Sequence, residues 1–212
     1  MAEELEEARY PCPACGATLY GWTAAHDPLD RGKRIVLDRC ESCGLSVTRA
    51  ADPPDADAEL EPLIADAGSG RVELTAPNRR SLQGSLGGAQ WAGLEPELRR
   101  LHLTPESVRL LLAKRGIEVE EIRTPLGKRS RRLMIQTMIN AFTYRDNFLR
   151  NAHAGIVPRS TSSEAWLYRL DWVVSYLVYL PSAFFGIPLE AIGSWMGRGG
   201  VMEVEGRRTT PS

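Results

Sequence analysis

Apolar residues at helical spacing are clearest in the middle of the chain. Val108, Leu111 and Leu112 place an apolar face on a segment that Thr104 introduces as a good N-cap. Pro105 and Glu106 suit the first turn, where a missing N–H costs nothing and a negative charge meets the positive end of the helix dipole. Gly116 suits the C-terminal cap, so the pattern predicts a helix between Thr104 and Gly116.

Alternating apolar and charged positions predict strands. Ile117, Val119 and Ile122, with charges between them, indicate a half-buried strand directly after that helix. Arg71–Ala76 is also expected to be a strand. Nearer the N-terminus, Thr18–Trp22 and Arg34–Asp38 are typical of a short hairpin, with the turn at 26–32.

Residues 128–150 have the pattern of a basic amphipathic helix. Basic residues open the segment from Lys128, and Met134, Met138 and Phe142 follow at a spacing of four. Two interpretations fit: a helix packed on the sheet with a solvated basic start, or a helix in contact with anionic lipid. Nucleic-acid binding is disfavoured, because aromatic and basic residues do not interleave along the segment.

The next segment, which Ser162 or Ser163 is expected to cap, is mostly apolar. Its stripe consists of Trp166, Leu170, Val173, Leu177 and Leu180. No charged residue occurs between Trp172 and Leu189, a length at the lower edge for crossing a bilayer. Because Pro181, Gly186 and Pro188 interrupt the run, we expect a broken helix that caps the core or lies in a membrane surface.

Composition indicates a folded protein whose net charge is too small to produce a strong overall electrostatic field. The 212 residues are 43% hydrophobic and 25% charged, with a net charge of −1. Charge is distributed unevenly along the chain. Residues 50–66 contain six acidic residues and no basic one, whereas residues 128–159 contain seven basic residues and a single acidic one, Asp146. The start, Met1–Arg9, is acidic and not apolar, which argues against a signal peptide and for a reducing, cytoplasmic location.

All four cysteines belong to two matching motifs. Cys12 and Cys15 are two residues apart and followed by a glycine, and Cys40 and Cys43 repeat the pattern. Two such turns supply four thiolates, which is the tetrahedral set that a structural zinc takes. A redox dithiol or a disulfide is the alternative, but redox pairs normally lie at a helix start in a βαβ unit. We therefore predict a closed structural zinc site without catalytic chemistry.

An acidic, proline-containing stretch follows the cysteines. Residues 50–66 are expected to form a linker, with a short helix at Ala58–Ala67. Asp66, Gly68 and Gly70 then resemble part of a glycine-rich cofactor loop. Such a loop should follow a buried strand and open a helix, whereas Pro62 precedes this one and a strand follows it. The alternative interpretation is a turn that leads into a strand.

A longer series of features points to one family. A strand ending in Pro77-Asn78 is followed by a loop with Trp91, by the helix start in Leu101–Ser107, and by the strand 117–122. This order resembles the C-terminal part of class I S-adenosylmethionine (SAM)-dependent methyltransferases, especially bacterial members that begin with a two-CxxC ribbon. The resemblance covers about residues 9–49, 63–123 and 194–208. It implies a Rossmann-like sheet, SAM as cofactor, and a final strand within Gly197–Glu205.

The chain departs from that family where the cofactor should bind. A complete member has roughly 100 residues between the ribbon and the Pro-Asn strand, judged by the size of a doubly wound nucleotide half. Here only about 28 residues separate Arg49 from Pro77. No strand–loop–helix unit fits in that interval, so we expect that this chain alone does not bind SAM in the family's way.

The sequence thus predicts an α/β or α+β protein. Its parts are a zinc ribbon (9–49), an acidic linker (50–66), a methyltransferase-like remnant with a sheet of about three strands (67–125), two long helices (126–196) and a final strand (197–208). Three functions stay open. The first is a degenerate methyltransferase-like zinc-binding protein, inactive or dependent on a partner or second copy. The second is a zinc-ribbon adaptor that docks on a membrane surface or a protein through 128–195. The third is an active methyltransferase with an abbreviated site at Asp66–Gly70.

Overall fold

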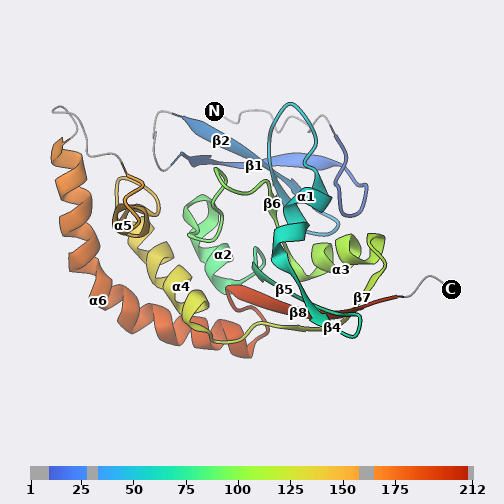
Figure 1. Ribbon diagram of the computed structural model, residues 1–212. Helices are drawn as coiled ribbons and strands as arrows, with labels where there is room; N and C mark the ends of the chain where they lie inside the picture. The colour runs from blue at the N-terminus through green and yellow to red at the C-terminus, as the bar shows by residue number, and fades with distance from the viewer. Residues whose placement is uncertain (1–9, 28–32, 158–164, 210–212) are drawn as a thin grey trace.

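The computed structural model describes residues 10–27, 33–157 and 165–209. Its strands form two four-stranded sheets, and one long helix runs along the outside of the molecule (Figure 1). Every strand pairing in the described residues is antiparallel. The fold is therefore mixed α and β as predicted, but the described residues contain no parallel βαβ unit of the kind that builds a Rossmann half.

The first sheet is built on the predicted hairpin. Strands β1 (Leu19–His26) and β2 (Arg34–Cys40) pair antiparallel, and β3 (Ser46–Thr48) and β6 (Leu101–His102) extend the sheet. The hairpin prediction is confirmed, although β1 extends to His26, into the predicted turn. Residues 28–32 of that turn lie outside the described residues.

The second sheet brings distant parts of the chain together. Its order is β4 (Ile64–Gly68), β5 (Arg71–Pro77), β8 (Val201–Arg208) and β7 (Ile117–Arg123). The strands predicted at 71–76 and 117–122 are thus present, and the final strand predicted within 197–205 is present from Val201 onward. They are joined by β4, where the sequence predicted a helix.

The predicted helix Ala58–Ala67 is wrong over its second half. Helix α1 (Ala56–Leu60) and the 3₁₀ turn η1 (Glu61–Leu63) end where β4 begins. Pro62 suits the short turn, and pairing with β5 then holds the following residues extended. Two short elements also lie between β5 and β6: α2 (Leu82–Gly87) and the 3₁₀ turn η2 (Gly88–Gln90).

Helix α3 (Pro105–Lys114) confirms the predicted capping signals. The Thr104 hydroxyl accepts a hydrogen bond from the Ser107 backbone N–H, and the Ser107 hydroxyl accepts one from the Thr104 N–H. Gly116 ends the helix in the left-handed region, with φ of 67°. In Figure 1, α3 lies between the two sheets, and its buried face belongs to their common core.

That common core includes the cysteine-containing hairpin. Buried side chains of the hairpin region, α3 and the second sheet form one contiguous cluster, which includes Leu19, Leu45, Leu74, Leu112 and Met202. The two sheets therefore share one hydrophobic interior.

The predicted helix over 128–150 is interrupted. Helix α4 (Lys128–Asn140) ends at Ala141, and α5 (Phe148–His153) begins after Asn147, whose φ is 56°. The Asn147 N–H donates to the Asn140 side-chain oxygen, and the Asn140 amide donates in turn to the Asn147 oxygen. These bonds hold the chain in a left-handed turn, which asparagine tolerates better than most residues.

The predicted break in the last helix does not occur. Helix α6 (Ala165–Trp195) is continuous over 31 residues and contains both Pro181 and Pro188. It curves around α4 (Figure 1), as expected where prolines remove backbone hydrogen bonds. Small residues on its inner face allow close packing, since a Cβ on Gly186 would lie 2.9 Å from the Met138 sulfur. Ser162 and Ser163, the predicted caps, lie outside the described residues.

Candidate functional site

Two matching turns carry the four cysteines. In the first, the Gly16 N–H donates to the Cys12 carbonyl at 2.8 Å, and Gly16 has φ of 78°. In the second, the Gly44 N–H donates to the Cys40 carbonyl at 2.9 Å, and Gly44 has φ of 73°. Positive φ is accessible to glycine without strain, which explains why a glycine follows each pair.

These turns bring the four sulfurs into one cluster. All four Sγ atoms lie within 4.8 Å of one another. Cys12 Sγ lies 3.6 Å from Cys43 Sγ, and Cys15 Sγ lies 3.4 Å from Cys40 Sγ. A tetrahedral site with metal–sulfur bonds of about 2.3 Å has sulfur–sulfur edges of about 3.8 Å. The four residues predicted as ligands are therefore close enough to bind one metal ion.

Burial disfavours thiolates in this cluster when no cation is present. Burial raises the pKa of Cys12 to about 11 and raises that of Cys43 further. For Cys40, burial also acts to raise the pKa, but hydrogen bonds from the Cys43 backbone N–H and neighbouring thiols outweigh it and lower the pKa. A metal ion that binds here must displace protons, as thiolate ligands require.

The cluster is attached to the rest of the fold. The Thr104 hydroxyl donates to the Cys43 carbonyl at 2.7 Å, which joins the second turn to the start of α3. Lys114, at the other end of α3, donates to the Pro13 carbonyl at 2.6 Å. Cys12, Cys40 and Cys43 are buried and only Cys15 is exposed. This closed arrangement has the character of a structural metal site.

The second predicted site lies in a tight hairpin. Asp66 and Gly68 are in β4, and Gly70 precedes β5. The Gly68 N–H donates to the Asp66 carboxylate at 2.9 Å, and Gly68 and Gly70 both have positive φ. The segment is a turn that leads into a strand, which is the alternative interpretation that the sequence left open. A contact of these residues with SAM stays a prediction.

The apolar stripe of α6 faces outward. Large side chains at a spacing of three and four residues are exposed along the helix: Trp166, Leu170, Val173, Leu177, Leu180 and Phe184. Only 17% of the most apolar 18-residue window is buried, although α6 is long and apolar enough to cross a membrane. The stripe itself is therefore not part of the core, whereas the opposite face of α6 packs on a buried cluster of α4 and α5, so both predicted roles of the helix stay open.

Buried acidic side chains attach the opposite face of α6 to the domain. Near the start, Asp171 accepts a hydrogen bond from the Tyr144 N–H at 2.6 Å. Near the end, the Glu190 carboxylate accepts bonds from the Gln83 amide and the Gly200 N–H, each at 2.7 Å, and from the Ser130 hydroxyl. Glu190 is completely buried, so this carboxylate is held entirely by protein donors.

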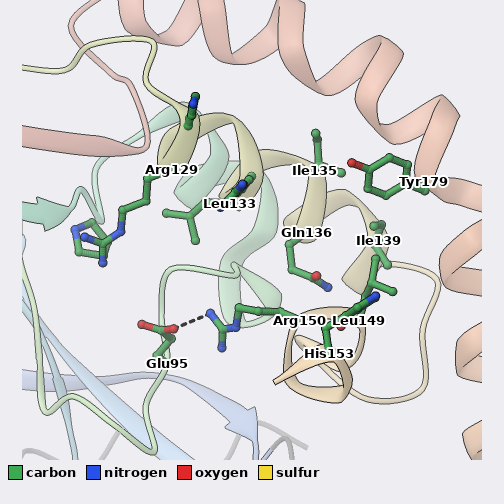
Figure 2. Close-up of a pocket in the computed structure, with 13 residues that line it drawn as sticks. Glu95, Arg129, Leu133, Ile135, Gln136, Ile139, Leu149, Arg150, His153 and Tyr179 are labelled. Carbon is green, nitrogen blue, oxygen red and sulfur yellow. Dashed lines mark hydrogen bonds and ion pairs between the residues drawn. The ribbon is translucent and has the colours of Figure 1, made fainter. Parts of the chain in front are cut away.

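A cavity of about 920 Å³ lies beside α4, α5 and α6 (Figure 2). Ile135, Ile139, Leu149 and Tyr179 contribute apolar surface to it. Its basic lining comes from Lys128, Arg129, Arg132, Arg150 and His153. Arg150 pairs with Glu95 at 2.5 Å (dashed line in Figure 2). The cavity thus combines basic and apolar surface next to the exposed helix.

Sequence patterns do not identify two of the groups described here. Glu190 follows the uncharged run and gives no sign that it is buried. Arg79 is also buried, although it follows Asn78 at the end of a strand, where solvent exposure is the usual expectation for arginine. His102 is buried, and its Nε2 forms a hydrogen bond of 3.0 Å with the Thr48 hydroxyl, so the ring is packed within the fold.

Comparison with known proteins does not assign a family. The chain matches no protein-family model, no curated protein and no solved structure.

Proposed function

We propose that this chain is a zinc-ribbon protein that docks on an anionic membrane surface through α6. The observation that supports this proposal most strongly is the outward-facing stripe of Leu177, Leu180 and their neighbours. A contiguous apolar surface of this kind is uncommon on a protein that works without a partner or a membrane. The four-thiolate cluster would hold a structural zinc ion that stabilises the domain to which the helix is attached.

Contacts at both ends of α6 favour a helix that lies in the surface over one that crosses the bilayer. Asp171 and Glu190 are 19 residues apart, and both bond to residues of the folded domain. A spanning helix would have to release both carboxylates from these donors and place them near hydrocarbon, which is costly. An in-plane helix keeps both and inserts only its outer face, by about 5–10 Å.

Basic residues near α6 suit an anionic surface. Lys128, Arg129 and Arg132 are exposed and have no ion-pair partner within the described part of the chain. Each basic residue near an anionic membrane contributes about 1 kcal/mol of attraction, which salt screens. Binding is therefore expected to depend on anionic lipid and to weaken at high ionic strength.

Vesicle flotation tests the proposal with a matched pair of variants. We expect the zinc-loaded protein to float with vesicles that contain phosphatidylserine, and the Leu177→Asp/Leu180→Asp variant to bind at least about tenfold more weakly, because each buried leucine contributes about 1.5–3 kcal/mol. Leu98→Asp is the control, since Leu98 is as exposed as these residues but lies outside α6. Absence of wild-type binding, or an equal loss in the control, would contradict the proposal. Dimers that form without lipid and are lost in the double variant would assign the face to a second copy.

We also propose, as a second candidate, that the chain is a degenerate methyltransferase-like protein. This candidate rests on the order of β5, α3, β7 and β8 along the chain, which is the order that the resemblance implies, and the all-antiparallel second sheet gives it no further support. Calorimetric titration of SAM into the zinc-loaded protein tests this candidate. No heat and no thermal shift at millimolar SAM are expected. Binding at micromolar strength would instead favour an active enzyme that uses Asp66–Gly70 or a second copy.

A further inference from the structure

A second cavity lies beside the cysteine cluster, on a different surface from α6. Its volume is about 440 Å³, and it is bordered by the second CxxC turn, the end of β5 and the start of α3. Three arginines line it: Arg39, Arg79 and Arg80. One acidic residue, Glu41, also lines it, and Glu41 is exposed and forms no ion pair with these arginines. The surface is therefore predominantly cationic.

Arg79 is the unusual member of this set. It is only 8% exposed, and no carboxylate pairs with it in the part of the chain that the structure describes. Its guanidinium lies 4.0 Å from the centre of the Trp22 ring and 5.9 Å from that of Trp91, and one terminal nitrogen donates to the Gly84 carbonyl. The buried Nε has no acceptor. A buried cation with an unused donor is costly unless an anion pairs with it.

Neighbouring arginines add to the positive potential. Burial, and then the nearby charge of Arg39, lower the pKa of Arg79 to about 10. Arg39 is exposed and has no ion-pair partner among the described residues. Arg80 pairs with Glu106 at 2.5 Å, but both side chains are largely exposed, where such pairs are weak and exchangeable.

We propose that this cavity binds the phosphate group of a small phosphorylated molecule. Planar guanidiniums donate pairs of hydrogen bonds that match phosphate oxygens, and more than one unpaired arginine favours a dianion over a single carboxylate. Stacking on Trp22 holds the Arg79 fork in a fixed position, so little freedom is lost on binding. The cavity is larger than a phosphate ion, which leaves room for the rest of the ligand.

Titration of the protein with inorganic phosphate and with pyrophosphate tests this proposal. Binding is measured by calorimetry and by ³¹P NMR, in a buffer without other oxyanions. The zinc-loaded full chain is expected to bind pyrophosphate in a saturable way, and Arg79→Gln and Arg39→Gln to weaken binding at least about tenfold each. Arg39 is exposed, so its variant tests the proposal even if Arg79→Gln fails to fold. Arg71→Gln is the control, because Arg71 is exposed at the other end of β5.

Two results would overturn the proposal. One is the absence of saturable binding at millimolar phosphate and pyrophosphate. The other is an equal loss of affinity in Arg71→Gln and Arg39→Gln, which would mean that the ions respond only to total charge.

Discussion

Replacement of Glu190 by alanine should destabilise the protein more than any exposed substitution. The Glu190 carboxylate is fully buried in the last turns of α6. It accepts hydrogen bonds from the Gln83 amide and the Gly200 N–H at 2.7 Å each, and from the Ser130 hydroxyl. The Gln83 side chain also accepts a bond from the Trp91 indole at 3.1 Å, so the network extends from α6 to the loop after α2.

The size of the effect can be worked from these contacts. A hydrogen bond to a charged group contributes about 1.5–3 kcal/mol, and a donor left buried without an acceptor costs about 1–3 kcal/mol. The three bonds share one carboxylate, so their contributions do not add fully. We expect Glu190→Ala to lower the free energy of unfolding by about 3–5 kcal/mol, which is a large part of the about 5–15 kcal/mol typical of a domain.

Urea unfolding of the zinc-loaded protein, followed by tryptophan fluorescence, measures this loss. Trp91 reports directly, because its indole belongs to the network. Glu203→Ala is the matched control, since Glu203 is exposed on β8. A loss in Glu190→Ala that stays within about 0.5 kcal/mol of the control would refute the reasoning, because the carboxylate would then contribute no more than a surface charge.

Three further predictions concern the cysteine cluster, the buried histidine and a close backbone contact. Replacement of Cys40 and Cys43 by serine should abolish bound zinc and unfold the ribbon, because metal binding and folding are coupled; unchanged zinc by elemental analysis would count against this. Burial lowers the pKa of His102 to about 3, whereas the pKa in the unfolded chain is near 6.5. Between pH 3 and pH 6.5 the imidazole is therefore protonated in the unfolded state and neutral in the folded state. The free energy of unfolding should therefore fall by about 1.4 kcal/mol per unit as the pH drops below 6.5, and His102→Gln should remove that slope in urea titrations; an identical slope in both proteins would exclude His102 as its source. Gly200→Ala should lower the melting temperature measured by calorimetry, because the alanine Cβ would lie 1.7 Å from the Gln83 amide nitrogen. An unchanged melting temperature would show that the Gln83 side chain can move away without cost.

Elements with local signals could be predicted from the sequence. The cysteine spacing identified the four metal-binding candidates, and the capping residues around Thr104 located α3. Alternation found β5, whose inner face is buried, and β7, whose inner face is half-buried. In these cases the deciding interactions are made by residues close in the sequence.

Features that depend on distant contacts were missed. The sequence predicted a break at Pro181 and Pro188, but packing of the inner face of α6 on α4 keeps the helix continuous. Residues 64–67 form a strand for a local reason instead, because the tight turn at Gly68 and Gly70 pairs them with the neighbouring strand β5. The burial of Glu190 could not be predicted, because it results from Gln83, Ser130 and Gly200, which are distant in the sequence. The burial of Arg79 could not be predicted either, because its guanidinium lies against Trp22 of β1.

Depth-dependent quenching of Trp195 tests the docking proposal most directly. Trp195 is 88% exposed at the end of α6, and the difference between wild type and Trp195→Phe isolates its fluorescence. With anionic vesicles that carry lipids brominated at known acyl positions, the account predicts quenching by shallow bromines and little by deep ones, since an in-plane helix inserts about 5–10 Å. No quenching at any depth, or strongest quenching at the bilayer centre, would contradict a helix that lies in the membrane surface.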